Sequence, residues 1–114
     1  MRVQVILEDK EENYREVINV ENVLDKKHFS YVDSYGATND LRVFNDGISI
    51  FRLDENHKTF VVLRKKSFIE VKTSEGSIKF SVKILALNLN NDIISIGYCV
   101  SDYKKHIEIR YLGE

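Results

Sequence analysis

Proline and tryptophan are absent from this sequence of 114 residues, and cysteine occurs once, at Cys99. A single thiol can form neither an internal disulfide nor a zinc site of the multi-cysteine kind. Proline would remove hydrogen-bond donors from the ladders of a sheet, so its absence is compatible with a β fold. Only five glycines are present, and no two stand two residues apart, which excludes a glycine-rich phosphate loop.

Long apolar runs and an excess of one charge are also missing. The longest apolar runs, at 60–63 and 84–87, have four residues, whereas a membrane helix needs about 20. The N-terminal segment lacks the apolar core of a signal peptide. The 17 basic and 18 acidic residues give a net charge of -1, and the one tight basic cluster, 64–66, is interpreted as a solvated turn. We therefore expect a cytoplasmic protein that binds neither nucleic acid nor a membrane.

The sequence does contain a repeated alternation of apolar and polar residues. It is clear in the segments 2–8, 77–84 and 106–111. Side chains of a strand point to opposite faces with a period of two, so this pattern predicts strands with one buried and one solvated face. Repeated along the chain, it predicts a single antiparallel all-β domain over residues 1–114.

Turn signals divide the chain into ten expected short strands. Glycine in the triplet 45–47 gives the clearest hairpin signal, and an acid-rich stretch within 9–22 has room for one helical turn. No gap is long enough for a crossover helix, which favours an up-and-down barrel of about 8–10 strands over the alternative, a sandwich. The expected strands are 2–8, 14–24, 28–33, 38–44, 48–53, 58–64, 67–73, 77–89, 93–101 and 103–112.

The eighth expected strand changes its alternation partway along. Its apolar residues fall on even positions through Ile84 and on odd positions from Leu85 onward. A shift by one residue is typical of a bulge or a sharp corner, which barrels and orthogonal sandwiches need in order to close. Alternation in this strand and the next also predicts one shared core: Ile78, Phe80, Val82, Ile94, Ile96 and Tyr98.

Several short motifs resemble the YwiB-like family of small uncharacterised bacterial proteins, which have a calycin-like (lipocalin-like) β-barrel. They are Tyr31-Val32-Asp33, the ISIFR segment ending at Arg52, the turn 73–76 and the strand 96–98. Ser74 stands where the family turn has a proline. The resemblance implies the barrel fold and brings no established activity with it.

No constellation for catalysis, metal binding or a cofactor is apparent. The three histidines, His28, His57 and His106, lack the spacing of a metal pair and are expected to be exposed. Cys99 lies mid-strand and is interpreted as a buried small hydrophobe rather than a nucleophile. Without a nucleophile, base and oxyanion site, we expect no enzyme. The small residues on its face, from Ser95 to Ser101, predict either close packing or a cavity wall.

Three residues are the candidate ligand-binding positions: Tyr31, Arg52 and Tyr98. Parity places Arg52 on the inward face of its strand, where it would pair with an acid such as Asp33, contact an anionic ligand, or be exposed. The sequence favours binding of a small apolar or amphipathic molecule in the barrel mouth. The alternative is a protein–protein interaction module with a filled barrel and no ligand.

Overall fold

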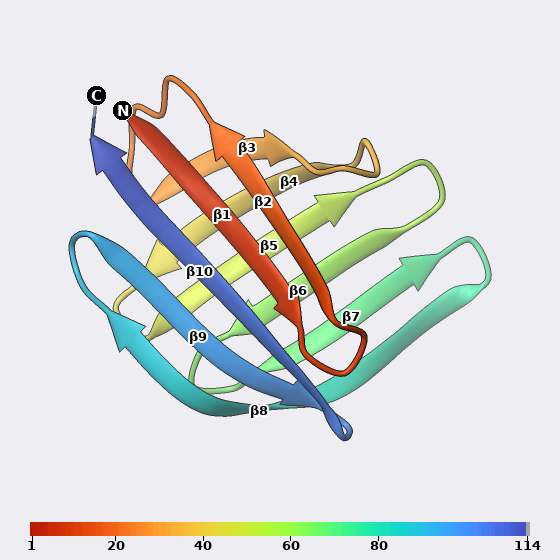
Figure 1. The fold of residues 1–114 in the computed structure, drawn as a ribbon. Coiled ribbons are helices and arrows are strands. Elements are labelled where there is room, and N and C mark those ends of the chain that lie inside the picture. The colour runs from red at the N-terminus through yellow and green to blue at the C-terminus, as the bar shows by residue number, and fades with distance from the viewer. Residues whose placement is uncertain (114) are drawn as a thin grey trace.

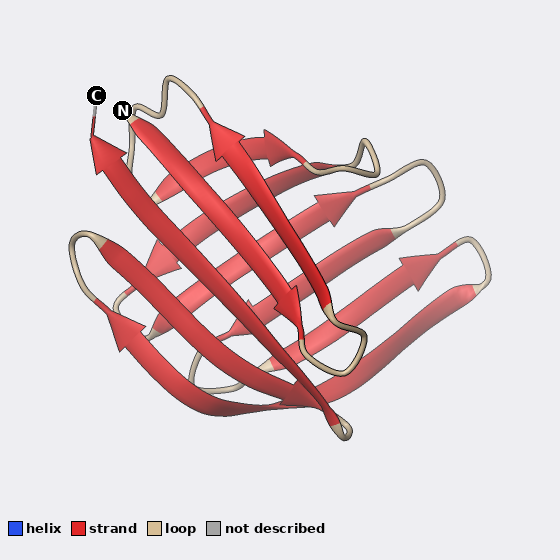
Figure 2. Cartoon of the chain, viewed as in Figure 1, coloured by secondary structure: helices blue, strands red, loops and turns tan. Residues whose placement is uncertain are grey.

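The computed structural model describes residues 1–113, and Figures 1 and 2 show these residues as ten strands joined by loops. No membrane-spanning helix is found among residues 1–113. The strands are β1 (Arg2–Asp9), β2 (Tyr14–Val20), β3 (His28–Val32), β4 (Thr38–Phe44), β5 (Gly47–Leu53), β6 (Lys58–Leu63), β7 (Phe68–Thr73), β8 (Gly76–Leu89), β9 (Ile93–Val100) and β10 (Tyr103–Gly113).

The strands form an antiparallel up-and-down sheet in the order β2-β1-β10-β9-β8-β7-β6-β5-β4-β3. The sheet curls into a nearly closed barrel, in which β1, β2, β9 and β10 cross over β3 to β7 (Figure 1). Because β2 and β3 stand at opposite ends of this order, no backbone ladder joins them, and a seam remains between them. The predicted all-β barrel is confirmed.

The largest difference from the expected boundaries lies at β2, which ends at Val20 rather than near residue 24. Asn22 adopts a left-handed φ of 57°, which turns the chain away from the ladder. Val23 then exchanges two backbone hydrogen bonds with Met1, at 2.9 and 3.0 Å. The acid-rich stretch after Asp9 forms a tight turn without a helix.

Strand β8 belongs to both layers and forms the corner between them. Its first half, 76–81, pairs with β7, and its second half, 82–89, pairs with β9. The register shifts between Ile84 and Ala86, which leaves Leu85 without a partner in the β8–β9 ladder. The bulge that the change of alternation predicts is therefore present, and it bends the strand where the layers meet.

The β4–β5 hairpin closes as the sequence predicts, with Phe44 opposite Gly47. Gly47 has a φ of 151°, and a Cβ atom there would lie 1.8 Å from the carbonyl oxygen of Leu63. Any larger residue would collide with Leu63, so only glycine allows β5 to lie this close to β6. The turn thus holds three neighbouring strands in register.

The core lies between the crossing layers and is made mostly of aliphatic side chains from both, with Phe29 and Tyr31. Ile96 is fully buried and Ile94 is 3% exposed, but Ile78 and Phe80 are 62% and 40% exposed. Val82 and Tyr98 pack against the core. The predicted sharing of one core by all six residues is therefore wrong for Ile78 and Phe80. Strand β9 pairs with β8 only from Val82 onward, so the first half of β8 extends past the layer that would cover it.

Candidate functional site

A cavity of about 360 Å³ opens at the end of the barrel that carries the β1–β2 and β3–β4 turns. All three predicted site residues, Tyr31, Arg52 and Tyr98, line it. They come from β3, β5 and β9, so the crossing layers bring together side chains that are far apart in the sequence. The apolar wall of the cavity consists of Leu7, Ile50, Val61, Leu63 and Ile107.

Two inward-facing rows of β5 to β8 continue this wall to the rim. Residues opposite one another in neighbouring strands share a face. Ile50, Val61, Ile69 and Phe80 form one such row across four strands. The next row runs from Arg52 to Ile78. The exposed Ile78 and Phe80 therefore extend the inner surface of the barrel beyond the cavity.

Arg52 forms the ion pair that the sequence predicts, with Asp33. Its Nε donates to Oδ2 of Asp33 at 2.7 Å, and its Nη1 lies 3.5 Å from Oδ2 of Asp54. The Asp33 side chain is 7% exposed and the Arg52 side chain is 27% exposed. A guanidinium that already contacts two carboxylates has its charge compensated by the protein, which favours the structural interpretation of Arg52 over contact with an anionic ligand.

Asp33 is held by four hydrogen-bond donors. Its Oδ1 accepts from the N–H groups of Tyr35 and Ala37, at 3.0 and 3.2 Å, and Oδ2 also accepts from Asn39 Nδ2 at 3.1 Å. Burial disfavours the charged carboxylate, but the bonds from Arg52, Asn39 and the backbone outweigh it and lower the pKa of Asp33. The same pairing raises the pKa of Arg52. This end of the barrel is therefore fastened by an ionised pair.

The buried Tyr31 and the half-buried Tyr98 differ from Asp33 because their hydroxyl groups have no hydrogen-bond partner among the described residues. Tyr31 is only 6% exposed, and neither its hydroxyl nor that of Tyr98 forms a hydrogen bond within residues 1–113. No fully occluded polar side-chain atom lacks a partner in that part of the chain, so these hydroxyls retain contact with open space, which here is the cavity. Burial raises the pKa of both phenols, to about 12 for Tyr98, so both remain protonated.

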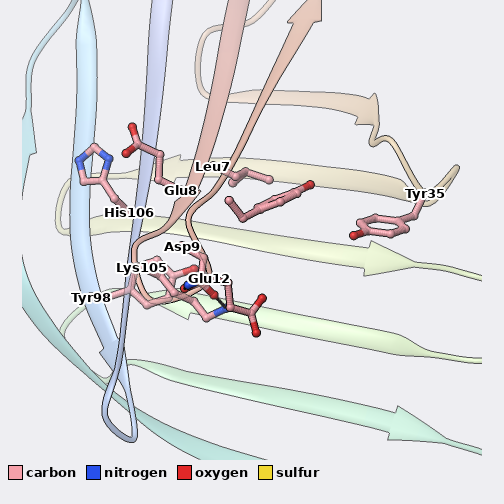
Figure 3. Close-up of a pocket in the computed structure, with 9 residues that line it drawn as sticks. Leu7, Glu8, Asp9, Glu12, Tyr35, Tyr98, Lys105 and His106 are labelled. Carbon is pink, nitrogen blue, oxygen red and sulfur yellow. Dashed lines mark hydrogen bonds and ion pairs between the residues drawn. The ribbon is translucent and has the colours of Figure 1, made fainter.

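A smaller pocket of about 290 Å³ adjoins the cavity and shares Leu7, Tyr14, Tyr35 and Tyr98 with it. In Figure 3, Tyr35 lies across the opening from the group that contains Asp9, Glu12, Lys105 and Tyr98. Lys105 Nζ lies 3.0 Å from Oδ2 of Asp9. Tyr35 itself is 77% exposed, so it lies at the rim rather than inside.

Glu16 links the two sides of the barrel seam. Its Oε1 accepts from the Ser34 N–H at 2.8 Å, and its Oε2 accepts from the Tyr14 hydroxyl at 2.6 Å. The sequence does not indicate Tyr14, Glu16 and Tyr35 as site residues. The alternation of 14–24 keeps no single parity, and Tyr35 falls in a connection, so neither segment indicates which way its side chains point.

None of the other candidates lines the cavity, although His106 lines the adjoining pocket. His28 and His57 are exposed as expected, whereas His106 is half-buried and lies 2.8 Å from Ser95 Oγ. Cys99 is half-buried rather than buried, because it faces outward on β9 while Ile94 and Ile96 face the core. The Ser95–Ser101 face is thus an outer surface and not a cavity wall.

The side chains of residues 1–113 do not indicate a metal site. Within residues 1–113, no three His, Cys, Asp or Glu side chains gather in a way that could hold a metal ion. The Ser95–His106 pair also lies on the outer face, away from the apolar cavity. The polar groups at the cavity are therefore the tyrosine hydroxyls, the paired Asp33 and Arg52, Asn39 and Glu16.

Comparison with known proteins gives one structural similarity. No family model matches the chain, and no curated protein matches its sequence. The crystal structure of the ywiB protein from Bacillus subtilis is similar over 99% of this chain and 89% of the other, with a TM-score of 0.56 and 18% sequence identity. Similarity at this identity concerns the fold alone, and the architecture of this chain is YwiB-like.

Proposed function

We propose that this protein is a non-catalytic binding protein that holds a small amphipathic molecule in the barrel cavity. The observation that carries the proposal is the pair of unpartnered tyrosine hydroxyls, Tyr31 and Tyr98, at a cavity whose surface is mostly apolar. Ligand sites have volumes of about 300–1,000 Å³ and combine apolar walls with a few polar groups. The cavity of about 360 Å³ suits a ligand at the small end of that range.

The distribution of polar groups supports an amphipathic ligand over a wholly apolar one. Ile50, Val61 and Leu63 line the cavity from neighbouring strands, whereas Glu16 and Asp33 stand at the seam side. A ligand with an apolar part and one polar group can fill the first region and satisfy a tyrosine hydroxyl. A wholly apolar ligand would bury those hydroxyls without partners, at a cost of about 1–3 kcal/mol each.

The test is displacement of N-phenyl-1-naphthylamine, a neutral fluorophore, from the full chain. We expect the fluorophore to bind the wild-type protein with increased emission, and small amphipathic molecules to displace it. Substituting Ile50→Trp fills the cavity with a larger side chain and is expected to abolish binding. Leu53→Trp on the same strand, at an exposed position outside the cavity, is the matched control and should bind as the wild type does.

Two results would contradict cavity binding. One is the absence of any fluorophore binding by folded wild-type protein, with folding checked by circular dichroism. The other is equal binding by the Ile50→Trp and Leu53→Trp variants, since the fluorophore would then occupy another surface.

A protein–protein interaction module is the second candidate function, and the exposed apolar side chains of β8 favour it. Ile78, Phe80, Leu85 and Leu87 are all exposed on this corner strand. Exposed apolar patches often mark sites where another chain docks. Concentration-dependent association of the wild-type protein that is lost on Ile78→Ser and Phe80→Ser substitution would support this function, and a monomer at all concentrations would argue against self-association.

A further inference from the structure

The charges around the cavity are unequally compensated. Both cations at the opening are already paired with the protein's own acids: Arg52 with Asp33 and Asp54, and Lys105 with Asp9. An anionic ligand would have to compete with these carboxylates for the same groups. The paired cations therefore provide no free positive charge for a ligand.

Glu16 has no such compensation. Both of its oxygens accept hydrogen bonds from neutral donors, the Tyr14 hydroxyl and the Ser34 N–H, and no basic side chain of residues 1–113 lies within 4.0 Å. Burial opposes its ionisation, but these two bonds outweigh burial and lower the pKa of Glu16. An ionised and uncompensated carboxylate thus lines the cavity.

Aromatic side chains also line this cavity. Four of the six tyrosines line the cavity: Tyr14, Tyr31, Tyr35 and Tyr98. The face of an aromatic ring attracts cations, most strongly where water is excluded. One of these rings already has a cation beside it, since the Arg52 guanidinium carbon lies 6.0 Å from the centre of the Tyr35 ring.

The hydroxyl of Tyr31, which stays open to the cavity, adds an independent indication of a ligand. This side chain is more than nine-tenths buried, lines the cavity and has no hydrogen-bond partner among the described residues. A phenol hydroxyl can accept a hydrogen bond from an ammonium group, as Glu16 can through its remaining lone pairs. The carboxylate and the aromatic rings favour a cation, and the phenol can accept a hydrogen bond from it.

We propose that the cavity selects an amphipathic organic cation, with a protonated amine beside Glu16 and the tyrosines and an apolar part against Ile50, Val61 and Leu63. This inference rests on the proposed binding function and specifies its ligand class. The selectivity arises because a carboxylate and ring faces stabilise an ammonium group, whereas the same groups repel a carboxylate ligand.

Three ligands of equal chain length test the inference: octylammonium, 1-octanol and octanoate, each measured by displacement of N-phenyl-1-naphthylamine from the full chain. Octylammonium is expected to bind about tenfold more tightly than octanol, the factor that corresponds to one charged hydrogen bond, and octanoate should bind least. Glu16→Gln should remove most of the preference for octylammonium while octanol binding stays the same. Glu21→Gln, an exposed position beyond β2 and outside the cavity, is the matched control and should change neither.

The outcomes separate this inference from the binding function itself. Equal affinity for octylammonium and octanol, tighter binding of octanoate, or an unchanged preference in Glu16→Gln would overturn the charge selectivity and leave cavity binding in place. No displacement by any of the three ligands would overturn both. Should Glu16→Gln not fold, the wild-type protein still decides, because added salt must weaken octylammonium binding and leave octanol binding unchanged.

Discussion

The centre of the barrel and its open rim have the same sequence pattern and different burial. Ile94 and Ile96 on β9 are separated by Ser95 and are almost completely buried, whereas Ile78 and Phe80 on β8 are separated by Lys79 and are exposed. The difference lies in the opposite layer, which covers the centre and not the first half of β8. Alternation thus determines which face a side chain occupies, and the crossing of the layers determines whether that face is covered.

The largest expected effect comes from truncating a central residue. Ile96→Ala removes a fully buried side chain and should lower the free energy of unfolding by about 2–5 kcal/mol, because a cavity remains between the layers. Ile78→Ala is the matched change at the rim and should cost less than about 1 kcal/mol. Urea denaturation of the two variants measures both. Equal losses would show that the first half of β8 is covered in solution.

An intermediate effect is expected at the ion pair that fastens the rim. Arg52→Met leaves the 7%-exposed Asp33 carboxylate without its cation. We expect a loss of about 1–3 kcal/mol, between the roughly 3–5 kcal/mol of a fully buried pair and the 0–1 kcal/mol of an exposed one. Adding Asp33→Asn should restore part of the loss, because the amide oxygen can still accept from the backbone of Tyr35 and Ala37. Additive losses in the double variant would mean that the two side chains do not act as a pair.

Acid should weaken the same pair. The pKa of Asp33 is lower in the folded protein than its ordinary value of 3.8, so ionised Asp33 adds stability above the unfolded pKa. That stability is lost as the pH falls through the folded pKa. The difference in unfolding free energy between wild type and Asp33→Asn should therefore shrink between about pH 5 and pH 2. A difference that stays constant or grows on acidification would contradict the direction of the shift.

The smallest effect on stability is expected inside the cavity. Tyr31→Phe removes a hydroxyl that has no partner within the protein, so the free energy of unfolding should change by less than about 0.5 kcal/mol. The ring, which packs beside Phe29, is retained. A loss above about 1 kcal/mol would indicate that the hydroxyl is bonded in the folded protein after all.

Local sequence features predicted much of the fold because they depend on neighbouring residues only. The hairpin at Gly47 and the bulge at Leu85 follow from turn chemistry and from a change of alternation. The alternation of its strand also correctly predicted that Arg52 points inward, where it pairs with Asp33. These features need no knowledge of how the layers cross.

Other features depend on how the two layers of strands cross, which local sequence patterns do not determine. The exposure of Phe80 depends on how far β9 runs along β8. Glu16 lies at the cavity because of the seam between β2 and β3. No backbone ladder joins these strands, so no strand pairing predicts which residues face one another there. Tyr31 and Tyr98 were predicted as site residues, and the structure places both at one cavity, but their contact with a ligand stays a prediction.

The pairing of β1 with β10 has a consequence for folding kinetics. Gly113 lies opposite Arg2, so a short linker could join residue 113 to residue 1. Opening the chain at the fully exposed Leu24 would then give a circular permutant that runs from β3 through β10 to β1 and β2. Every ladder would join strands consecutive in the chain, which lowers the contact order, so this permutant should fold faster than the natural chain order.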